Sequence, residues 1–307
     1  MSTQANAMPE FDSQRIAPAV LSPTRPLYWS IRRELWENRS IYLVPLAVAA
    51  LTLFGFLISA IRLPAKMRAA SGLDPMQQLQ DIEKPFTFAA MLIMGASFVV
   101  GIVYCLDALH GERRDRSILF WKSLPVSDLT TVLSKMSIPL AVIPVLYFVI
   151  TLATQWIMLL LASVVLLASG QNAAILWTHI PWFQMSAMLF FHLFGVHAIW
   201  YAPLYAWLVL VSAWARRAAF LWAALPVVAI AIIEKIALNS THFVGMLAHH
   251  FGGDQGGDFI ASTRAMDPLS YLTLGKFLTS PGLWIGLAIA AVFTAAAVRL
   301  RRQQGPI

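Results

Sequence analysis

Two groups of side chains could carry chemistry: polar residues inside long apolar runs, and a charged segment between two such runs. In the first group, His197, Tyr201 and Tyr205 recur every four residues in one run, and Glu234 lies near the end of the next. The chain has no His-Glu-x-x-His motif, no Gly-x-Ser-x-Gly motif and no pair of aspartates within a run, which disfavours metal-dependent or nucleophilic catalysis. We interpret the four residues as helix-packing or interfacial groups, or as the lining of a path through the membrane.

The charged segment covers residues 107–137 and mixes both signs of charge. Its ionisable residues are Asp107, Glu112, Arg113, Arg114, Asp115, Arg116, Lys122, Asp128 and Lys135. A plain connection between two spans can be far shorter than this segment. A patch that binds the membrane surface would carry charges of one sign. Length and mixed charge therefore favour a protein-binding surface.

Within this segment the local pattern predicts a helix, a turn and a second helix. If the stretch GERRDRSILFW is helical, Glu112 and Arg116 lie four residues apart in the order that favours an ion pair. Pro125 then prevents a continuous helix, because proline lacks the backbone N–H that a helix interior requires. Ser127 or Asp128 is placed to cap the helix that follows, since short polar side chains accept hydrogen bonds from the first turn.

The composition indicates an integral membrane protein. Of the 307 residues, 59% are hydrophobic and 12% are charged, which leaves too little polar surface to cover a soluble globule of this size. The continuous apolar runs predict spanning helices rather than barrel strands. The net charge of +7 is spread over segments beside these runs, so nucleic acid is not expected as a partner. The single cysteine, Cys105, excludes a disulfide framework and a multi-cysteine metal site.

Six spans are expected, and residues 1–307 form a single all-α membrane domain. The spans lie at about 40–60, 86–106, 138–168, 184–213, 218–238 and 282–300. The third is longer than a membrane crossing requires and should tilt or project beyond the membrane. Of the 22 lysines and arginines, 15 fall on the side of the two termini and 7 on the other. The positive-inside rule therefore predicts that both termini are cytoplasmic.

Two further helical elements are expected beside the spans. The stretch RPLYWSIRRELWENRS (25–40) has apolar residues at three- and four-residue intervals and charges opposite, which predicts an amphipathic helix in the membrane interface. Its apolar residues are Leu27, Tyr28, Ile31, Leu35 and Trp36. The stretch DPLSYLTLGKFLTSPGLW (267–284) is interrupted by Gly275 and Pro281 and predicts a short re-entrant or interfacial helical element before the last span.

Two runs of the sequence resemble a known family. The run ERRDRSILFWKSLPVSDLTTVLSK (112–135) resembles the cytoplasmic segment between the second and third spans of bacterial type 2 ATP-binding-cassette (ABC) permeases, the membrane subunits of exporters. The run WYAPLYAWLVLVSAWARRAAFLWAALP (200–226) also resembles members of this family. The expected spans, the amphipathic helix and the helical element before the last span match the family's fold, so the resemblance covers most of the chain.

The resemblance implies that the chain pairs with a second copy or a similar subunit in the bacterial inner membrane and binds two copies of a separate ATPase. ATP and magnesium are expected on that ATPase, because this chain has no Gly-x-x-x-x-Gly-Lys-Ser/Thr motif, and no cofactor is expected here. In the family, the first cytoplasmic connection docks in a groove of the ATPase. The residues to which the resemblance assigns docking are Glu112, Arg113, Arg114, Asp115, Arg116, Ser117, Trp121 as a buried anchor, Ser123, Pro125 and Asp128.

Two other classes of protein remain alternatives. A secondary transporter driven by an ion gradient generally has doubled halves and discontinuous helices around central charges. Here only Glu234 and Lys235 come near such an arrangement, and they lie toward one end of a span. An intramembrane enzyme would have to use the histidines and acids of the spans without a recognisable motif. Contact with membrane lipid is expected in every case.

Overall fold

The computed structural model describes residues 24–70, 75–123, 126–252 and 274–303, and every regular element in these ranges is a helix. Six helical stretches among them are long and apolar enough to cross a membrane, which confirms the predicted number and indicates a multi-pass membrane protein. The six stretches are Ser40–Ala60, Ile82–Arg114, Asp128–Ala168, Trp182–Trp200, Ala219–Leu238 and Pro281–Gln303.

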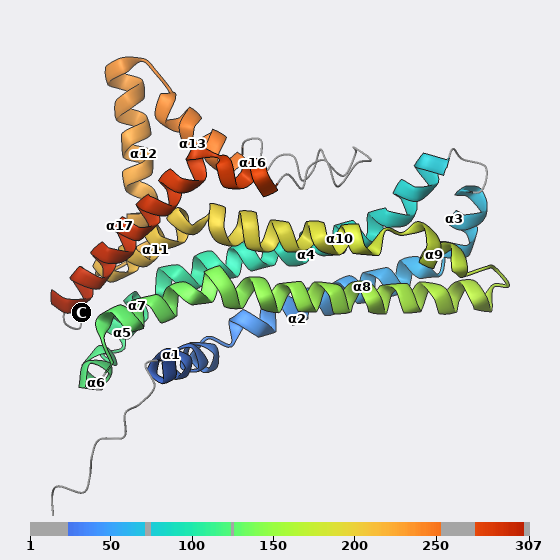
Figure 1. Ribbon diagram of the computed structural model, residues 1–307, viewed down its shortest axis with the longest axis horizontal. Helices are drawn as coiled ribbons and strands as arrows, with labels where there is room; N and C mark the ends of the chain where they lie inside the picture. The colour runs from blue at the N-terminus through green and yellow to red at the C-terminus, as the bar shows by residue number, and fades with distance from the viewer. Residues whose placement is uncertain (1–23, 71–74, 124–125, 253–273, 304–307) are drawn as a thin grey trace, which may run out of the picture.

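An elongated bundle forms the centre of the molecule (Figure 1). Its main helices are α2 (Ser40–Ala60), α4 (Pro75–Asp107), α8 (Ile143–Ala168), α11 (Ala202–Trp214) and α17 (Pro281–Gln303). Helices α2, α4 and α8 pack on one another, while α11 packs between α4 and α17. Apolar side chains fill the contacts, and Ile93, Tyr147 and Val209 are completely buried. Figure 1 shows the short helices α3 (Leu63–Ala70) and α9 (Ala174–His179) at the opposite end from the last turn of α17.

The third span is one continuous helical rod. It comprises α7 (Asp128–Ser137), a π-helical turn η2 (Ile138–Val142) and α8. Ser127 caps its start, because the Thr130 N–H donates to Ser127 Oγ at 3.0 Å, which confirms that a polar residue caps this helix. The rod begins ten residues before the predicted span, because the helix predicted after Pro125 continues into it. That the span tilts or projects beyond the membrane stays a prediction. Pro139 and Pro144 lack N–H donors and coincide with the change to π-helical geometry.

The fourth span, predicted at about 184–213, is interrupted. It consists of α10 (Trp182–Phe190), the π-helix η3 (Phe191–Trp200) and α11, with a turn at Tyr201. The cause is Pro203, whose ring conflicts with the carbonyl four residues earlier and which has no N–H to donate.

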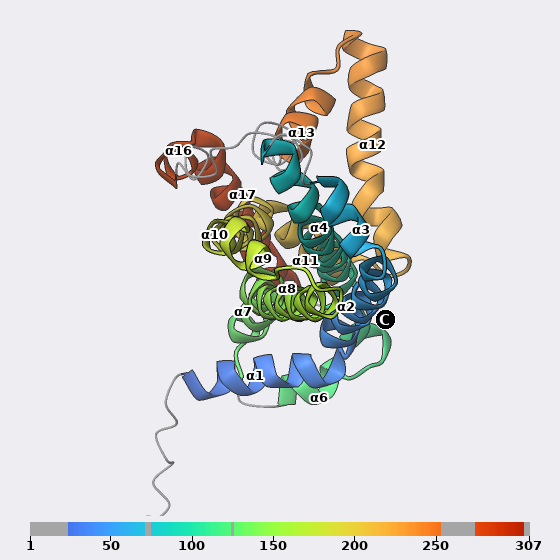
Figure 2. The same ribbon diagram turned by 90° about the vertical axis from the view of Figure 1, so that its right-hand side faces the viewer.

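Helix α1 (Thr24–Glu37) lies across the long axis of the bundle and packs against α7 (Figure 2). The two sides of the helix differ in burial: Glu34 is buried at 1% exposure, whereas Trp36 on the predicted apolar face is 66% exposed. Glu34 lies inside because charged partners on neighbouring helices hold it there. That the apolar face lies in the membrane interface stays a prediction.

The fifth span, α12 (Ala219–Leu238), projects away from the bundle and is the least buried of the six (Figures 1 and 2). Helix α13 (His242–Gly252) folds back beside it. The short helix α16 (Leu274–Thr279) precedes α17 and is the described part of the helical element predicted at 267–284. The remainder of that element before Leu274 lies outside the described residues.

Candidate functional site

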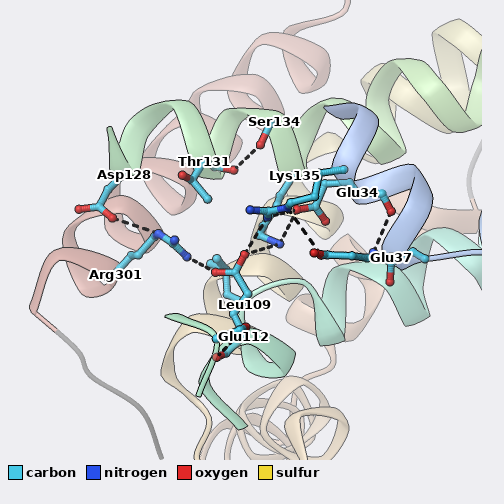
Figure 3. A network of polar contacts seen from close by, with 12 residues as sticks. Glu34, Glu37, Leu109, Glu112, Asp128, Thr131, Ser134, Lys135 and Arg301 are labelled. Atoms are coloured by element: carbon cyan, nitrogen blue, oxygen red, sulfur yellow. Dashed lines mark hydrogen bonds and ion pairs between the residues drawn. The ribbon is translucent and has the colours of Figure 1, made fainter. Parts of the chain in front are cut away.

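Six charged side chains meet where α1, α7 and α17 converge with the short helix α5 (His110–Arg114) (Figure 3). They are Arg33 and Glu34 on α1, Glu112 on α5, Asp128 and Lys135 on α7, and Arg301 on α17. We call this set the charge cluster. Four of its members are buried: Glu34, Glu112, Lys135 and Arg301. The cluster joins segments that are up to 268 positions apart in the chain, from Arg33 to Arg301.

Two cations bridge the carboxylates of α1 and α5. Lys135 Nζ lies 2.8 Å from Glu34 Oε1 and 3.1 Å from Glu112 Oε1. Arg33 Nη2 donates to the same two oxygens, at 2.6 Å and 3.0 Å respectively. The second oxygen of Glu34 accepts a hydrogen bond from the Tyr104 hydroxyl at 2.9 Å. Helices α1, α4, α5 and α7 are therefore fastened to one another through two carboxylates.

Arg301 connects the last span to this arrangement. Its Nη1 donates to Glu112 Oε2, and its Nε donates to Asp128 Oδ1 at 3.0 Å. Figure 3 shows the Arg301 side chain extending between these two carboxylates. The cytoplasm-side ends predicted for the third and sixth spans thus share one ion-pair network with α5.

The charges of the cluster balance, with three carboxylates and three cations. Burial alone would raise the pKa of the Glu34 carboxyl, but the charges of Lys135 and Arg33 outweigh burial and hold this pKa below its ordinary value. Glu34 therefore contributes stability that is present above its ordinary pKa and is lost as pH falls through the lowered folded value. Near neutral pH the carboxylate stays charged, and removal of any single partner would leave a buried charge uncompensated.

The segment that carries Glu112 bends sharply. After α5, Arg116 adopts a left-handed backbone with φ 58°, and a second short helix, α6 (Ile118–Ser123), follows. The prediction of an ion pair between Glu112 and Arg116 on one continuous helix is therefore wrong. The bend brings α6 beside α1, where the Arg33 guanidinium lies 3.9 Å from the centre of the Trp121 ring.

The ten residues that the resemblance assigned to docking differ in exposure. Arg114, Asp115, Arg116 and Ser123 are exposed, Ser117, Trp121 and Asp128 are half-buried, and Glu112 and Arg113 are buried. Pro125 lies outside the described residues. Arg113 Nη1 donates to the backbone carbonyls of Ala213 at 2.6 Å and Ala215 at 3.2 Å, at the end of α11. Glu112 and Arg113 therefore hold the segment in place and present no surface to a partner.

The sequence predicts an apolar patch of Ile118, Leu119 and Trp121 in this segment, and Phe120 was not part of that prediction. In the structure Leu119 and Phe120 are 59% and 60% exposed on α6, next to the half-buried Trp121, and form an apolar surface outside the spans, whereas Ile118 is buried. The run Ile-Leu-Phe-Trp in an otherwise polar segment was the available signal. The partners of Glu112 were also missed, because no local pattern connects this residue to α1 or to α17.

The polar stripe of the fourth span is packed inside the bundle. The Tyr205 hydroxyl lies 3.1 Å from His197 Nε2, and Ser97 Oγ on α4 lies 3.4 Å from the same nitrogen. Tyr201 is half-buried, with its ring 5.4 Å from that of Phe98. These contacts favour the helix-packing interpretation of His197, Tyr201 and Tyr205. That these residues line a path stays a prediction.

The close approach of α4 and α11 gives a first testable prediction. A Cβ placed on Gly101 would lie 3.2 Å from Tyr205 Cε1, whereas a Cβ on Gly95 of the same helix would meet nothing within 4 Å. Gly101→Val should therefore lower the free energy of unfolding by about 1–3 kcal/mol, because overpacking forces the tyrosine to move. Gly95→Val is the matched control and should cost less than half as much. Denaturant unfolding in detergent measures both, and equal losses would contradict the packing account.

Glu234 stabilises a helix start at the end of α12. Its two carboxylate oxygens accept hydrogen bonds from the backbone N–H groups of His242 at 2.6 Å and Phe243 at 2.9 Å, and from Ser240 Oγ at 2.7 Å. A carboxylate suits this place, because the first N–H groups of a helix have no partner within the helix. The contacts give Glu234 a capping role for α13. A path-lining role for Glu234 stays a prediction.

The capping role of Glu234 predicts a local effect. Glu234→Ala should raise hydrogen–deuterium exchange in the first turn of α13 severalfold, because two backbone N–H groups lose their acceptor. Lys235→Ala, a change at the exposed neighbouring position, is the control and should leave this exchange unchanged. Equal protection in both variants would show that the carboxylate does not hold the helix start.

No group of three or more His, Cys, Asp or Glu side chains that could hold a metal ion occurs in the described part of the chain. Comparison with protein-family models, with curated protein sequences and with solved structures finds no match. The class of protein is therefore inferred from the fold and the site of this chain alone. The chain is a helical protein of the multi-pass membrane type with a buried charge cluster at one end of its bundle.

Proposed function

We propose that this chain is the membrane subunit of an ATP-driven exporter of the type 2 ABC class. It resides in the bacterial inner membrane with both termini in the cytoplasm. Together with a second copy or a similar subunit it forms the translocation path. Two copies of a separate ATPase bind ATP and magnesium. In this arrangement α1 is the interfacial helix, α5 and α6 form the coupling element, and α16 belongs to the interfacial element before the last span.

One observation carries the proposal: the segment from α5 to α6 is exposed on one side and firmly held on the other. Its exposed side presents Leu119 and Phe120, and the exposed Arg114 and Arg116 precede them by a few residues in the chain. An apolar centre with a charged rim is the usual composition of a protein interface. The held side consists of Glu112 and Arg113, which bond to α7, α11 and α17.

This combination suits the transmission of motion. A partner that moves α6 also moves α5, because the two helices are consecutive. The charge cluster then passes the displacement to α1 and to the ends of the third and sixth spans. Closure of two ATPases on ATP would in this way rotate the two membrane halves and change access to the path.

Co-purification tests the proposal. The full-length chain is tagged in its native host, extracted in several mild detergents, and its partners are identified by mass spectrometry. We expect a protein with a Gly-x-x-x-x-Gly-Lys-Ser/Thr motif and ATP hydrolysis by the complex. If the chain is recovered without an ATPase in every detergent, the proposal fails and the ion-driven and enzymatic alternatives gain support.

A further inference from the structure

The outer face of α1 carries an unusual combination of aromatic and basic side chains. We define this face as Tyr28, Trp29, Arg32, Trp36 and Arg39. All five are exposed, with Trp29 at 57% and Trp36 at 66%. Their spacing of three and four residues places them along one side of the helix and the turn that follows it. The opposite side carries Glu34 into the charge cluster.

The Arg32 guanidinium contacts two tryptophan rings. Its guanidinium carbon lies 5.2 Å from the centre of the Trp29 ring and 4.8 Å from that of Trp36. No acidic side chain among the described residues forms an ion pair with Arg32, whereas the adjacent Arg33 pairs with Glu34 and Glu112. Stacking fixes the plane of the Arg32 guanidinium and leaves its N–H donors available for an anion.

The position of α1 places these donors at the surface of the membrane. Figure 2 shows α1 perpendicular to the long axis of the bundle, and the first span, α2, begins at Ser40 directly after it. The helix therefore runs along the membrane plane. Tryptophan and tyrosine favour the headgroup region, where their rings meet both water and hydrocarbon. Exposed arginines at this depth complement the negative phosphates of anionic lipids.

We infer that the outer face of α1 binds the headgroup of an anionic phospholipid. Arg32 is the phosphate ligand, and Trp29 and Trp36 orient it and contact the glycerol region of the same lipid. A soluble phosphate ion would satisfy the guanidinium but would leave both indole rings in water, so the occupant is a lipid of the surrounding membrane. The inference goes beyond the proposed function and holds whether or not an ATPase docks on α6.

Native mass spectrometry of the purified full-length chain tests this site. The chain is offered equal amounts of phosphatidylglycerol and phosphatidylcholine, and the bound lipids are counted. We expect the native chain to retain phosphatidylglycerol preferentially and Arg32→Gln to reduce this preference about fivefold, which is the contribution of one arginine near an anionic surface. Arg114→Gln, which removes an exposed arginine on α5, should leave the preference unchanged. The thermal unfolding midpoint of Arg32→Gln should equal that of the native chain, because Arg32 has no carboxylate partner to lose among the described residues.

A second set of measurements separates the possible occupants. Arg32→Lys retains the charge but loses the planar stack, so we expect it to recover only part of the preference. Millimolar inorganic phosphate should not displace the lipid. The inference is overturned if Arg32→Gln retains phosphatidylglycerol as well as the native chain does, or if phosphate competes. It is equally overturned if the variant loses a second copy of the chain or a protein partner while its lipid content stays the same.

Discussion

Replacing Glu112 by glutamine lowers the free energy of unfolding by about 3–5 kcal/mol, because the change leaves the three cations of the charge cluster with only two carboxylates. Glu112 is 7% exposed and accepts from Arg33, Lys135 and Arg301, so water cannot take the place of the lost charge. Glutamine has nearly the same shape. The loss therefore reports the missing charge and not a cavity.

Denaturant unfolding of the purified chain in mild detergent measures this effect. Asp115→Asn is the matched control, because Asp115 lies three residues away on the same segment and its one ion pair within the described residues is the exposed pair with Arg114. The control should unfold like the native chain. The double variant Glu112→Gln with Arg301→Gln restores the balance of charge, so its loss should fall below the sum of the two single losses by 0.5–3 kcal/mol. Additive losses, or equal losses for Glu112→Gln and the control, would show that the cluster contributes little.

If the proposed ATPase docks on α6, charging the apolar surface of this helix should weaken its binding strongly. In the variant with both Leu119→Asp and Phe120→Asp, two exposed apolar side chains become carboxylates, and neither is needed for the fold. Central apolar anchors at interfaces often contribute about 2 kcal/mol or more each, so binding should weaken on the order of a hundredfold or more. Pull-down with the partner ATPase at graded concentrations measures the change.

The control for this variant is Leu129→Asp, which charges another exposed leucine outside the apolar surface of α6. Leu129 is 49% exposed in the first turn of α7, where an acidic side chain is compatible with the helix start. The Leu129→Asp variant should bind the ATPase like the native chain. Retained binding by the α6 variant, or an equal loss in the control, would remove α6 from the docking surface.

The number of spans could be predicted because each is a long apolar run and lipid permits few alternatives to a helix. The cap at Ser127 followed from an equally local signal. That Pro203 can bend the fourth span was visible in the sequence, but the turn at Tyr201 and the π-helix before it were not. A proline in a membrane helix is compatible with a bend, a π-helix or a break, and contacts with neighbouring helices decide among these.

The charge cluster could not be predicted, because its members come from four separate segments. Glu112 had an apparent partner at Arg116, and the local pattern offered no reason to prefer Arg301. The turn at Arg116 was also hidden, since a left-handed backbone usually calls for glycine or asparagine and the sequence has arginine there. The burial of Glu34 follows from the same cluster and inverts the simple pattern of an amphipathic helix.

The most direct test of the proposed coupling is site-directed crosslinking in intact membranes of the native host. The only native cysteine, Cys105, is buried, so a new cysteine at Phe120→Cys is the one accessible thiol among the described residues. A short thiol-specific photo-crosslinker on this residue should capture one protein that contains a Gly-x-x-x-x-Gly-Lys-Ser/Thr motif and hydrolyses ATP. The same reagent at Phe183→Cys, an 83% exposed position on α10, should not capture it. Capture of the ATPase from both positions or from neither would contradict the docking of an ATPase on α6.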